Sequence, residues 1–338
     1  MGTSGIRIKS VAKQQADEIL GGNRRALARA ITLIESDRND HRASAGQLLE
    51  KLLPYTGRAT RIGISGSPGV GKSTFIEAFG LYLLSIGKQL AVLAVDPSST
   101  VSGGSIMGDK TRMEFLARNP NVYIRPTPAA GALGGIARHT REAMLLCEAA
   151  GFDVLLVETV GVGQSESDVA MLVDLFLLLV QPGGGDDLQG IKRGVMELAD
   201  LIIVNKTDGR LKDLALETVS DYKSALALLS SRTSQELETR VFPCSALESS
   251  GLLEIWKAIE IYKDMLADTG ELATNRGDQA ISWMWREISD QMLGAIKTNK
   301  NISSRAKTLE LKVRNGERTP MSAAIDILNL VNKNNENR

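Results

Sequence analysis

The sequence has few of the residues that mark several common classes of protein. Among its 338 residues are only two cysteines, Cys147 and Cys244, and two histidines, His41 and His139. The cysteines have no partner at the spacing of a motif, which argues against a structural disulfide. Because the histidines and cysteines form no cluster, the sequence also lacks the ligand set that delivery of a transition metal requires.

An excess of charge of one sign and a long apolar run are also absent. Lysine plus arginine and aspartate plus glutamate each total 40, so the formal net charge is zero, which argues against a dedicated surface for nucleic acid or an anionic membrane. The apolar run 175–180 is far shorter than the ~20 residues of a membrane span, and the polar N-terminus lacks a signal-peptide core. We therefore expect a cytoplasmic protein with no nucleic-acid or membrane partner.

What the sequence does contain is a phosphate-binding loop. Residues 66–73 read G-x-x-x-x-G-K-S and lie between an apolar strand-like run and a helix-like segment, a setting that an ordinary glycine-rich turn does not explain. The glycines let backbone N–H groups turn toward an anion, Lys72 brings a positive charge to the β- and γ-phosphates, and the Ser73 hydroxyl can bind Mg²⁺. The predicted phosphate-binding residues are Gly66, Ser67, Pro68, Gly69, Val70, Gly71, Lys72, Ser73 and Thr74.

A second segment predicts that the base is guanine. The apolar run 201–204 ends in N-K-x-D, formed by Asn205, Lys206, Thr207 and Asp208. The Asp208 carboxylate can accept hydrogen bonds from N1–H and the exocyclic amine of guanine, whereas adenine would leave it unpaired at a cost of about 1–3 kcal/mol. Asn205 would brace the loop, and the stem of Lys206 would lie along the base. Taken alone, N-K-T-D could be a strand-end turn, but its place downstream of the phosphate loop favours a guanine site.

The strand-like run 240–244 leads into Ser245, Ala246 and Leu247. This resembles the S-A-L turn that contacts guanine O6 through backbone N–H groups in GTPases. The motif is weak by itself, and it supports the guanine site because it follows N-K-x-D.

A third segment predicts the metal and γ-phosphate side of the site. The apolar run 154–157 delivers Glu158 and, three residues later, Gly161. Most GTPases place aspartate at the position of Glu158, and the extra methylene favours contact with Mg²⁺ through water. Gly161 would donate its N–H to the γ-phosphate. Since Val162 occupies the position of the water-orienting glutamine of Ras-like enzymes, we expect slow intrinsic hydrolysis.

Other charged residues are candidates for the same side of the site. Asp96 ends an apolar run and Asp109 follows Gly108; either could instead be a helix cap or a solvated loop residue. Lys192 follows a glycine-rich stretch after the run 175–180, and it could swing toward developing charge or remain solvated. The predicted catalytic residues are Lys72, Asp96, Asp109, Glu158 and Lys192, and the predicted metal ligands are Ser73, Asp96, Asp109 and Glu158.

Four longer runs carry a family resemblance: A-V-D-P-S-S-T at 94–100, G-G-S-I-M-G-D-K-T-R-M at 103–113, E-T-V-G-V-G-Q-S-E at 158–166 and G-G-D-D-L-Q-G-I-K at 184–192. With the phosphate loop and N-K-x-D, they closely resemble the MeaB/ArgK GTPases, the group associated with methylmalonyl-CoA mutase. The resemblance implies a GTP-hydrolysing chaperone that loads and protects an adenosylcobalamin-dependent acyl-CoA mutase. It also implies that Asp96, Asp109 and Glu158 line the Mg²⁺ site, and that the loop with Gln189 and Lys192 responds to the partner.

The pattern of apolar residues predicts three parts, and a hydrophobic content of 43% is ample for their cores. Residues 1–58 are predicted to form a helical arm, and residues 59–266 an α/β P-loop NTPase domain with a mainly parallel sheet flanked by helices. Residues 267–338 form a helical extension, in which an apolar stripe from Ile281 to Ile296 packs on its own domain or on a second copy. The resemblance implies a homodimer through this region. We expect Lys297–Arg318 to be a solvated hairpin or loop and a final helix to begin at Pro320.

Two other functions are consistent with parts of the sequence. A small-molecule kinase or ATPase would share the phosphate loop, but it has no use for N-K-x-D. A metallocentre-insertion GTPase would need a His- or Cys-rich stretch, which the sequence does not show.

Overall fold

The computed structural model describes residues 12–36, 38–96, 113–128, 133–159, 165–183, 193–230 and 239–336. The described strands form one sheet in the order β3-β2-β4-β1-β5-β6-β7, and each neighbouring pair is parallel. They are β1 (Thr60–Gly66), β2 (Leu90–Asp96), β3 (Val122–Pro128), β4 (Val154–Thr159), β5 (Leu175–Val180), β6 (Leu201–Val204) and β7 (Arg240–Pro243). The predicted parallel sheet is confirmed.

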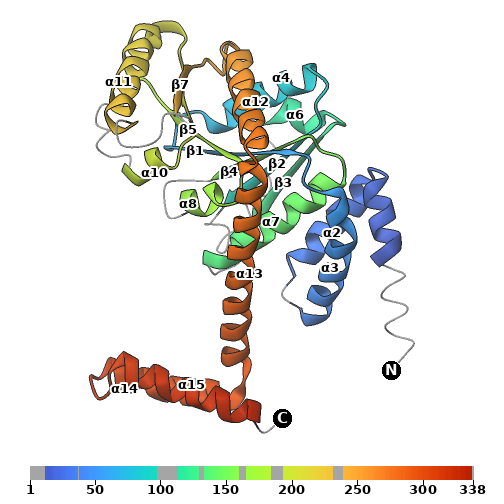
Figure 1. The fold of residues 1–338 in the computed structure, drawn as a ribbon, viewed down its shortest axis with the longest axis vertical. Helices are drawn as coiled ribbons and strands as arrows, with labels where there is room; N and C mark the ends of the chain where they lie inside the picture. Colours follow the sequence, from blue (N-terminus) through green and yellow to red (C-terminus); the bar gives the residue numbers. More distant parts are fainter. Residues whose placement is uncertain are drawn as a thin grey trace. The chain divides into compact units, whose positions relative to one another are not determined.

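Helices cover both faces of this sheet (Figure 1). On one face lie α4 (Lys72–Ser85), α6 (Glu114–Arg118) and α12 (Leu252–Asp268), and on the other α7 (Leu133–Ala149) and α8 (Ser165–Ala170). α11 (Lys212–Ser230) packs against β6 and β7 and follows directly after η2 (Gly209–Leu211), while α10 (Arg193–Glu197) precedes β6 along the chain. Strands covered on both faces must be apolar throughout, which explains why all six residues of β5 are buried.

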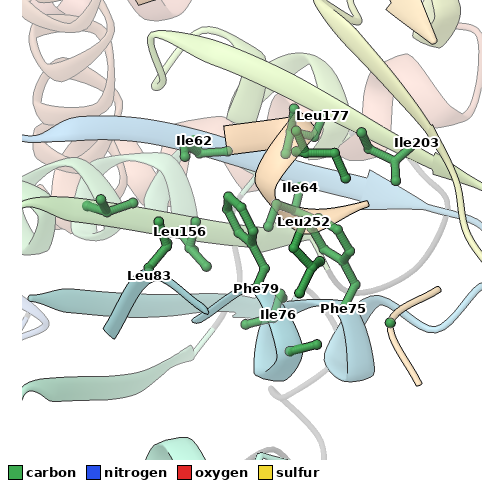
Figure 2. Close-up of a cluster of buried hydrophobic side chains, with 14 of the residues drawn as sticks. Ile62, Ile64, Phe75, Ile76, Phe79, Leu83, Leu156, Leu177, Ile203 and Leu252 are labelled. Carbon is green, nitrogen blue, oxygen red and sulfur yellow. The ribbon is translucent and has the colours of Figure 1, made fainter. Parts of the chain in front are cut away.

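The main core lies between the sheet and the helices α4 and α12. Ile62 and Ile64 of β1 meet Phe75 and Phe79 of α4, and Leu252 of α12 closes the cluster (Figure 2). The rings of Phe75 and Phe79 are stacked, with centroids 5.4 Å apart. Burial of each such side chain contributes about 1.5–3 kcal/mol, so this cluster holds α4, whose first turn ends the phosphate loop, firmly on β1.

The N-terminal arm is helical, as predicted. A helix over residues 12–20 is followed by α2 (Arg24–Ile34), α3 (Asn39–Leu52) and η1 (Leu53–Tyr55). The side chain of Asn23 caps α2 by accepting from the N–H groups of Arg25 and Ala26. Arg24 donates to the carbonyl oxygen of Pro120, two residues before β3, and to that of Val122, the first residue of β3, which is the outermost described strand on its side of the sheet. The arm therefore covers backbone acceptors at a sheet edge, where an open strand could pair with another chain.

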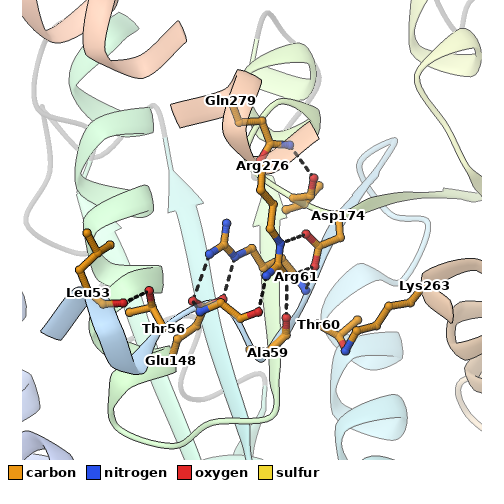
Figure 3. Close-up of polar contacts among 12 residues, drawn as sticks. Leu53, Thr56, Ala59, Thr60, Arg61, Glu148, Asp174, Lys263, Arg276 and Gln279 are labelled. Carbon is orange, nitrogen blue, oxygen red and sulfur yellow. Dashed lines mark hydrogen bonds and ion pairs between the residues drawn. The ribbon is translucent and has the colours of Figure 1, made fainter. Parts of the chain in front are cut away.

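A buried polar network closes the amino end of the central strands (Figure 3). Arg276, near the start of α13 (Glu271–Thr298), donates from Nε and Nη2 to the two oxygens of Asp174, each at 2.7 Å. It also donates to the carbonyl oxygens of Gly57 and Ala59. Arg61 forms a two-pronged ion pair with Glu148 of α7, at 2.8 and 3.0 Å. The side chains of Asp174 and Glu148 are each only 1% exposed, so these are buried ion pairs.

The described chain divides into two compact units, one ending at Gln279 and the other beginning at Ala280, a boundary that lies within α13. The second unit contains α14 (Lys300–Arg314) and α15 (Pro320–Glu336), so the predicted final helix at Pro320 is confirmed. The prediction of a hairpin or loop over Lys297–Arg318 is wrong. Asn299 caps α14, and Ile302 and Leu309 are buried, which stabilises a helix where the sequence is mostly polar. Among the described helices, none is long and apolar enough to cross a bilayer.

Candidate functional site

The phosphate loop joins the carboxyl end of β1 to α4. The N-cap of α4 is Gly71, whose φ of +94° lies in the left-handed region. A Cβ atom at this position would lie only 2.8 Å from Asn205 Nδ2, so only glycine fits. No side chain caps α4. Its first N–H groups therefore point, with the positive end of the helix dipole, toward the loop, which is the arrangement that binds a phosphate.

Lys72 lies in the first turn of α4, and its Nζ donates to the carbonyl oxygens of Gly66 at 2.7 Å and Ser67 at 3.3 Å. Burial lowers the pKa of the Lys72 ammonium, while the negative charges of Glu158 and Glu166 act in the opposite direction. The lysine is thus held within its own loop, beside two acidic residues. A bound phosphate would offer it a stronger acceptor than either carbonyl.

The N-K-x-D segment follows β6 and braces the phosphate loop. Asn205 is buried; its Nδ2 donates to Val70 O at 2.9 Å, and its Oδ1 accepts from the Ala246 N–H at 3.1 Å. Lys206 donates from Nζ to Gly69 O at 2.6 Å. Lys206 also has a φ of +63°, a left-handed conformation that costs a residue other than glycine about 1–2 kcal/mol. Such strain is typical of functional sites, and it could not be predicted from the residue type, since lysine has no preference for this conformation.

Asp208 is held in place by the S-A-L turn. The Ser245 hydroxyl donates to Asp208 Oδ1 at 2.7 Å and accepts from the Glu248 N–H at 3.0 Å. Ser245 and Ala246 are buried, whereas the Leu247 side chain is 78% exposed. The structure therefore brings together the predicted residues of the phosphate loop, the N-K-x-D segment and the S-A-L turn, which lie at the ends of β1, β6 and β7.

The metal side of the site is described in part. Glu158 is 4% exposed and lies one residue before the end of β4. Ser73 is in the first turn of α4, and Asp96 ends β2, whose Val95 pairs with Thr159 of β4. Within the described residues, no group of three or more His, Cys, Asp and Glu side chains could hold a metal ion. Hydroxyl and carboxylate oxygens suit Mg²⁺, which takes one or two carboxylates and completes its shell with phosphates and water, so Ser73 and Glu158 fit that ion.

Several predicted residues lie outside the described part of the chain. They are Asp109, Gly161, Gln189 and Lys192, together with the side chain of Asp96. Their roles remain predictions.

Two features of the site were missed from the sequence. Glu166, in α8, is 6% exposed and close enough to Lys72 for its charge to act on the lysine. The Thr159 hydroxyl donates to the Ser65 hydroxyl at 2.9 Å, with both residues fully buried. Glu166 could have been suspected, because it is an acidic residue in the first helix after the strand that carries Glu158. The bond between Thr159 and Ser65 could not, because a single serine and a single threonine in apolar strands form no recognisable motif.

Comparison with known proteins agrees with this geometry. The chain is 48% identical over 299 residues to GTPase ArgK of Escherichia coli, covering 88% of this chain and 90% of that protein. It is 46% identical over 316 residues to the mitochondrial methylmalonic aciduria type A homolog of Mus musculus, covering 90% and 76%. The crystal structure of an LAO/AO transport system kinase matches 96% of this chain and 98% of its own, with a TM-score of 0.74 and 38% identity.

The last comparison confirms the predicted α/β P-loop NTPase fold, since it spans the sheet and its flanking helices. A family model described as methylmalonyl Co-A mutase-associated GTPase MeaB matches residues 27–301, which include the phosphate loop, the N-K-x-D segment and the S-A-L turn. The chain therefore belongs to the MeaB family of methylmalonyl-CoA mutase-associated GTPases.

Proposed function

We propose that this protein binds GTP with Mg²⁺, hydrolyses it to GDP and phosphate, and uses that cycle to gate the loading of adenosylcobalamin onto an acyl-CoA mutase of the methylmalonyl-CoA mutase type, which it also protects. The observation that carries the nucleotide part is the placement of Asp208. Ser245 fixes its carboxylate, while Asn205 and Lys206 tie the same segment to the phosphate loop. A guanine reader and a phosphate cradle are thereby held as one site.

In this proposal each part of the site has a role. Lys72 and the phosphate loop bind the β- and γ-phosphates, and the Gly161 N–H contacts the γ-phosphate. Ser73 and the carboxylates of Glu158, Asp96 and Asp109 would hold Mg²⁺, directly or through water, and the bound ion would supply positive charge against the charge that develops on the transferred phosphoryl group. Lys192 approaches that group when a partner binds, and the S-A-L turn meets guanine O6.

The base preference is tested by exchanging Asp208 for asparagine. Guanine offers two donors to the carboxylate, N1–H and the 2-amino group, whereas xanthine has a carbonyl oxygen in place of that amino group. An amide presents one NH₂ donor group and one oxygen acceptor to the base, so Asp208→Asn should weaken GTP binding by about 10-fold or more and improve XTP binding. Titrations of wild type and variant with GTP, XTP and ATP measure this.

A wild-type protein that binds ATP as tightly as GTP, or a variant with unchanged preference, would refute the guanine site. The first result would favour the alternative of a small-molecule kinase or ATPase.

The mutase part of the proposal is supported by the family match and by the name of the mouse relative, and it needs a direct test. We expect the full-length chain to retain an adenosylcobalamin-dependent acyl-CoA mutase from native lysate, and the purified mutase to accelerate GTP hydrolysis. Recovery of no cobalamin enzyme in the presence of GTP, of GDP or of neither would refute the partner.

We also propose a homodimer formed through α13 and the helices after it. In the second unit, apolar side chains at helical spacing on α13 are exposed: Ile281, Trp285, Ile288 and Met292 are 39–61% exposed. Exposed apolar stripes of this kind mark association surfaces. Light scattering of the full chain that gave a monomer mass at every concentration would refute the dimer.

A further inference from the structure

The central strand β1 and its neighbour β4 separate just where the site begins. Their backbone pairing runs from Thr60↔Val154 to Ile64↔Glu158 and goes no further. Beyond that point β1 continues beside β5, with Gly66 opposite Leu179, while Thr159 pairs with Val95 of β2. After this point β1 leads into the phosphate loop, whereas β4, which contains Glu158, leads toward Gly161, the predicted contact of the γ-phosphate.

A side-chain hydrogen bond joins the two strands at this branch. The Thr159 hydroxyl lies 2.9 Å from the Ser65 hydroxyl oxygen, and it is 3.4 Å from the Ile64 carbonyl oxygen. Thr159 is 0% exposed and Ser65 is 1% exposed. In the two strands, Ile64 directly before Ser65 and Val157 two residues before Thr159 are apolar and fully buried, and Glu158 between Val157 and Thr159 is 4% exposed. A pair of hydroxyls in such surroundings is costly unless they bond to each other, so neither side chain is expected there for packing alone.

We propose that Ser65 and Thr159 are a positioning pair that fixes the spacing between the phosphate loop and the Glu158 strand, and so the spacing that a triphosphate with Mg²⁺ requires. The inference rests on the proposed GTPase function. Neither residue touches the nucleotide in this scheme. Ser65 acts through Gly66, the first residue of the phosphate loop, and Thr159 acts through Glu158 on one side and the segment toward Gly161 on the other.

This role makes a prediction that simple stabilisation does not. GDP uses the phosphate loop, which follows β1 where that strand lies beside β5, and the guanine reader, which follows β6 and β7. GTP with Mg²⁺ also uses the β4 side. Loss of the hydroxyl bond should therefore weaken GTP·Mg²⁺ relative to GDP, raise the Mg²⁺ concentration needed for half-maximal hydrolysis, and lower kcat. General loosening of the domain would weaken both nucleotides alike.

The experiment compares Thr159→Val, which keeps the shape and removes the hydroxyl, with Thr159→Ser, which keeps the hydroxyl. Thr60→Val is the matched control. Thr60 is a buried threonine at the opposite end of β1, whose hydroxyl accepts from Lys263 Nζ at 2.9 Å. For Thr159→Val we expect the ratio of GTP·Mg²⁺ to GDP affinity to fall about 5- to 10-fold, with a similar fall in kcat, and for Thr159→Ser recovery to within about twofold. Thr60→Val should leave the ratio unchanged.

If Thr159→Val does not fold, Ser65→Ala removes the same bond from the other strand and is read in the same way. A Thr159→Val or Ser65→Ala protein whose GTP·Mg²⁺ to GDP ratio and Mg²⁺ requirement equal those of wild type would overturn the inference, as would an equal loss for both nucleotides. Wild-type protein is measured first: if it neither binds nor hydrolyses GTP, the proposed function fails and this inference fails with it.

Discussion

The ion pair between Arg276 and Asp174 gives the sharpest test of how the first unit is held together. Arg276→Met keeps most of the aliphatic stem and removes the guanidinium. The side chain of Arg276 is 15% exposed and that of Asp174 is 1% exposed, so the substitution leaves the Asp174 carboxylate buried, with the Arg61 backbone N–H still donating to it at 2.9 Å. Breaking one side of a buried pair costs about 3–5 kcal/mol. We expect the free energy of local unfolding of β1 and β5 to fall by that amount.

Hydrogen exchange followed by mass spectrometry measures this loss locally, because β1 and β5 begin beside the network and their backbone amides report local unfolding there. Arg118→Ala is the matched control. It breaks an ion pair with Glu114 on α6 whose side chains are 74% and 59% exposed, and such a surface pair contributes about 0.3–0.5 kcal/mol. The double variant Arg276→Met with Asp174→Leu should recover part of the loss, because no charge then remains buried, although the Arg61 N–H loses its acceptor.

The reasoning would be refuted if Arg276→Met changed exchange in β1 and β5 by no more than Arg118→Ala does. In that case the network would be as weak as a surface pair in spite of its burial. A double variant less stable than Arg276→Met would show instead that Asp174 stabilises the fold mainly through the Arg61 N–H.

Two further variants test single contacts. Asn205→Ala removes the bonds to Val70 O and the Ala246 N–H, and should weaken GTP and GDP alike by about 10- to 100-fold, measured by nucleotide titration; unchanged affinities would show that Asn205 does not brace the site. Burial raises the pKa of Asp200, and the hydrogen bond from the Tyr262 hydroxyl at 2.6 Å opposes this. Tyr262→Phe should raise that pKa further and cost about 1–3 kcal/mol at pH 7. Because the ionised carboxylate loses more by the change than the neutral acid does, the cost should shrink as pH falls through the raised pKa. Urea denaturation at several pH values that showed a constant difference between wild type and variant would contradict this.

The motifs of the candidate nucleotide site could be predicted from the sequence because each is short and local. A phosphate loop must have glycine where the backbone turns, as at Gly71, and a lysine one residue later. The N-K-x-D segment likewise needs its residues at fixed spacing. Contacts between such parts were not readable, since the bond between Ser65 and Thr159 joins residues 94 apart and that between Arg276 and Asp174 joins residues 102 apart.

The one segment predicted wrongly shows the same limit. Over Lys297–Arg318 few residues are apolar, and the pattern alone favoured a solvated loop. In the structure α14 packs against α15, burying Ile302 and Leu309, and Asn299 caps its first turn. Most helical stability in proteins comes from packing of this kind, so a sparse stripe can be sufficient when a partner helix is present.

One regularity in the sequence explains how the sheet closes at the end opposite the candidate nucleotide site. An aspartate stands directly before each of β4, β5 and β6: Asp153, Asp174 and Asp200. Each accepts, through Oδ2, a backbone N–H at the start of a neighbouring strand, from Gln89 at 2.8 Å, Arg61 at 2.9 Å and Phe176 at 2.7 Å. Backbone donors at a buried strand end need acceptors, and a short carboxylate one residue outside the neighbouring strand reaches them. An aspartate immediately before an apolar run therefore marks the closed end of this sheet, and by the polarity of parallel strands it places the open, glycine-rich end with the phosphate loop at the other.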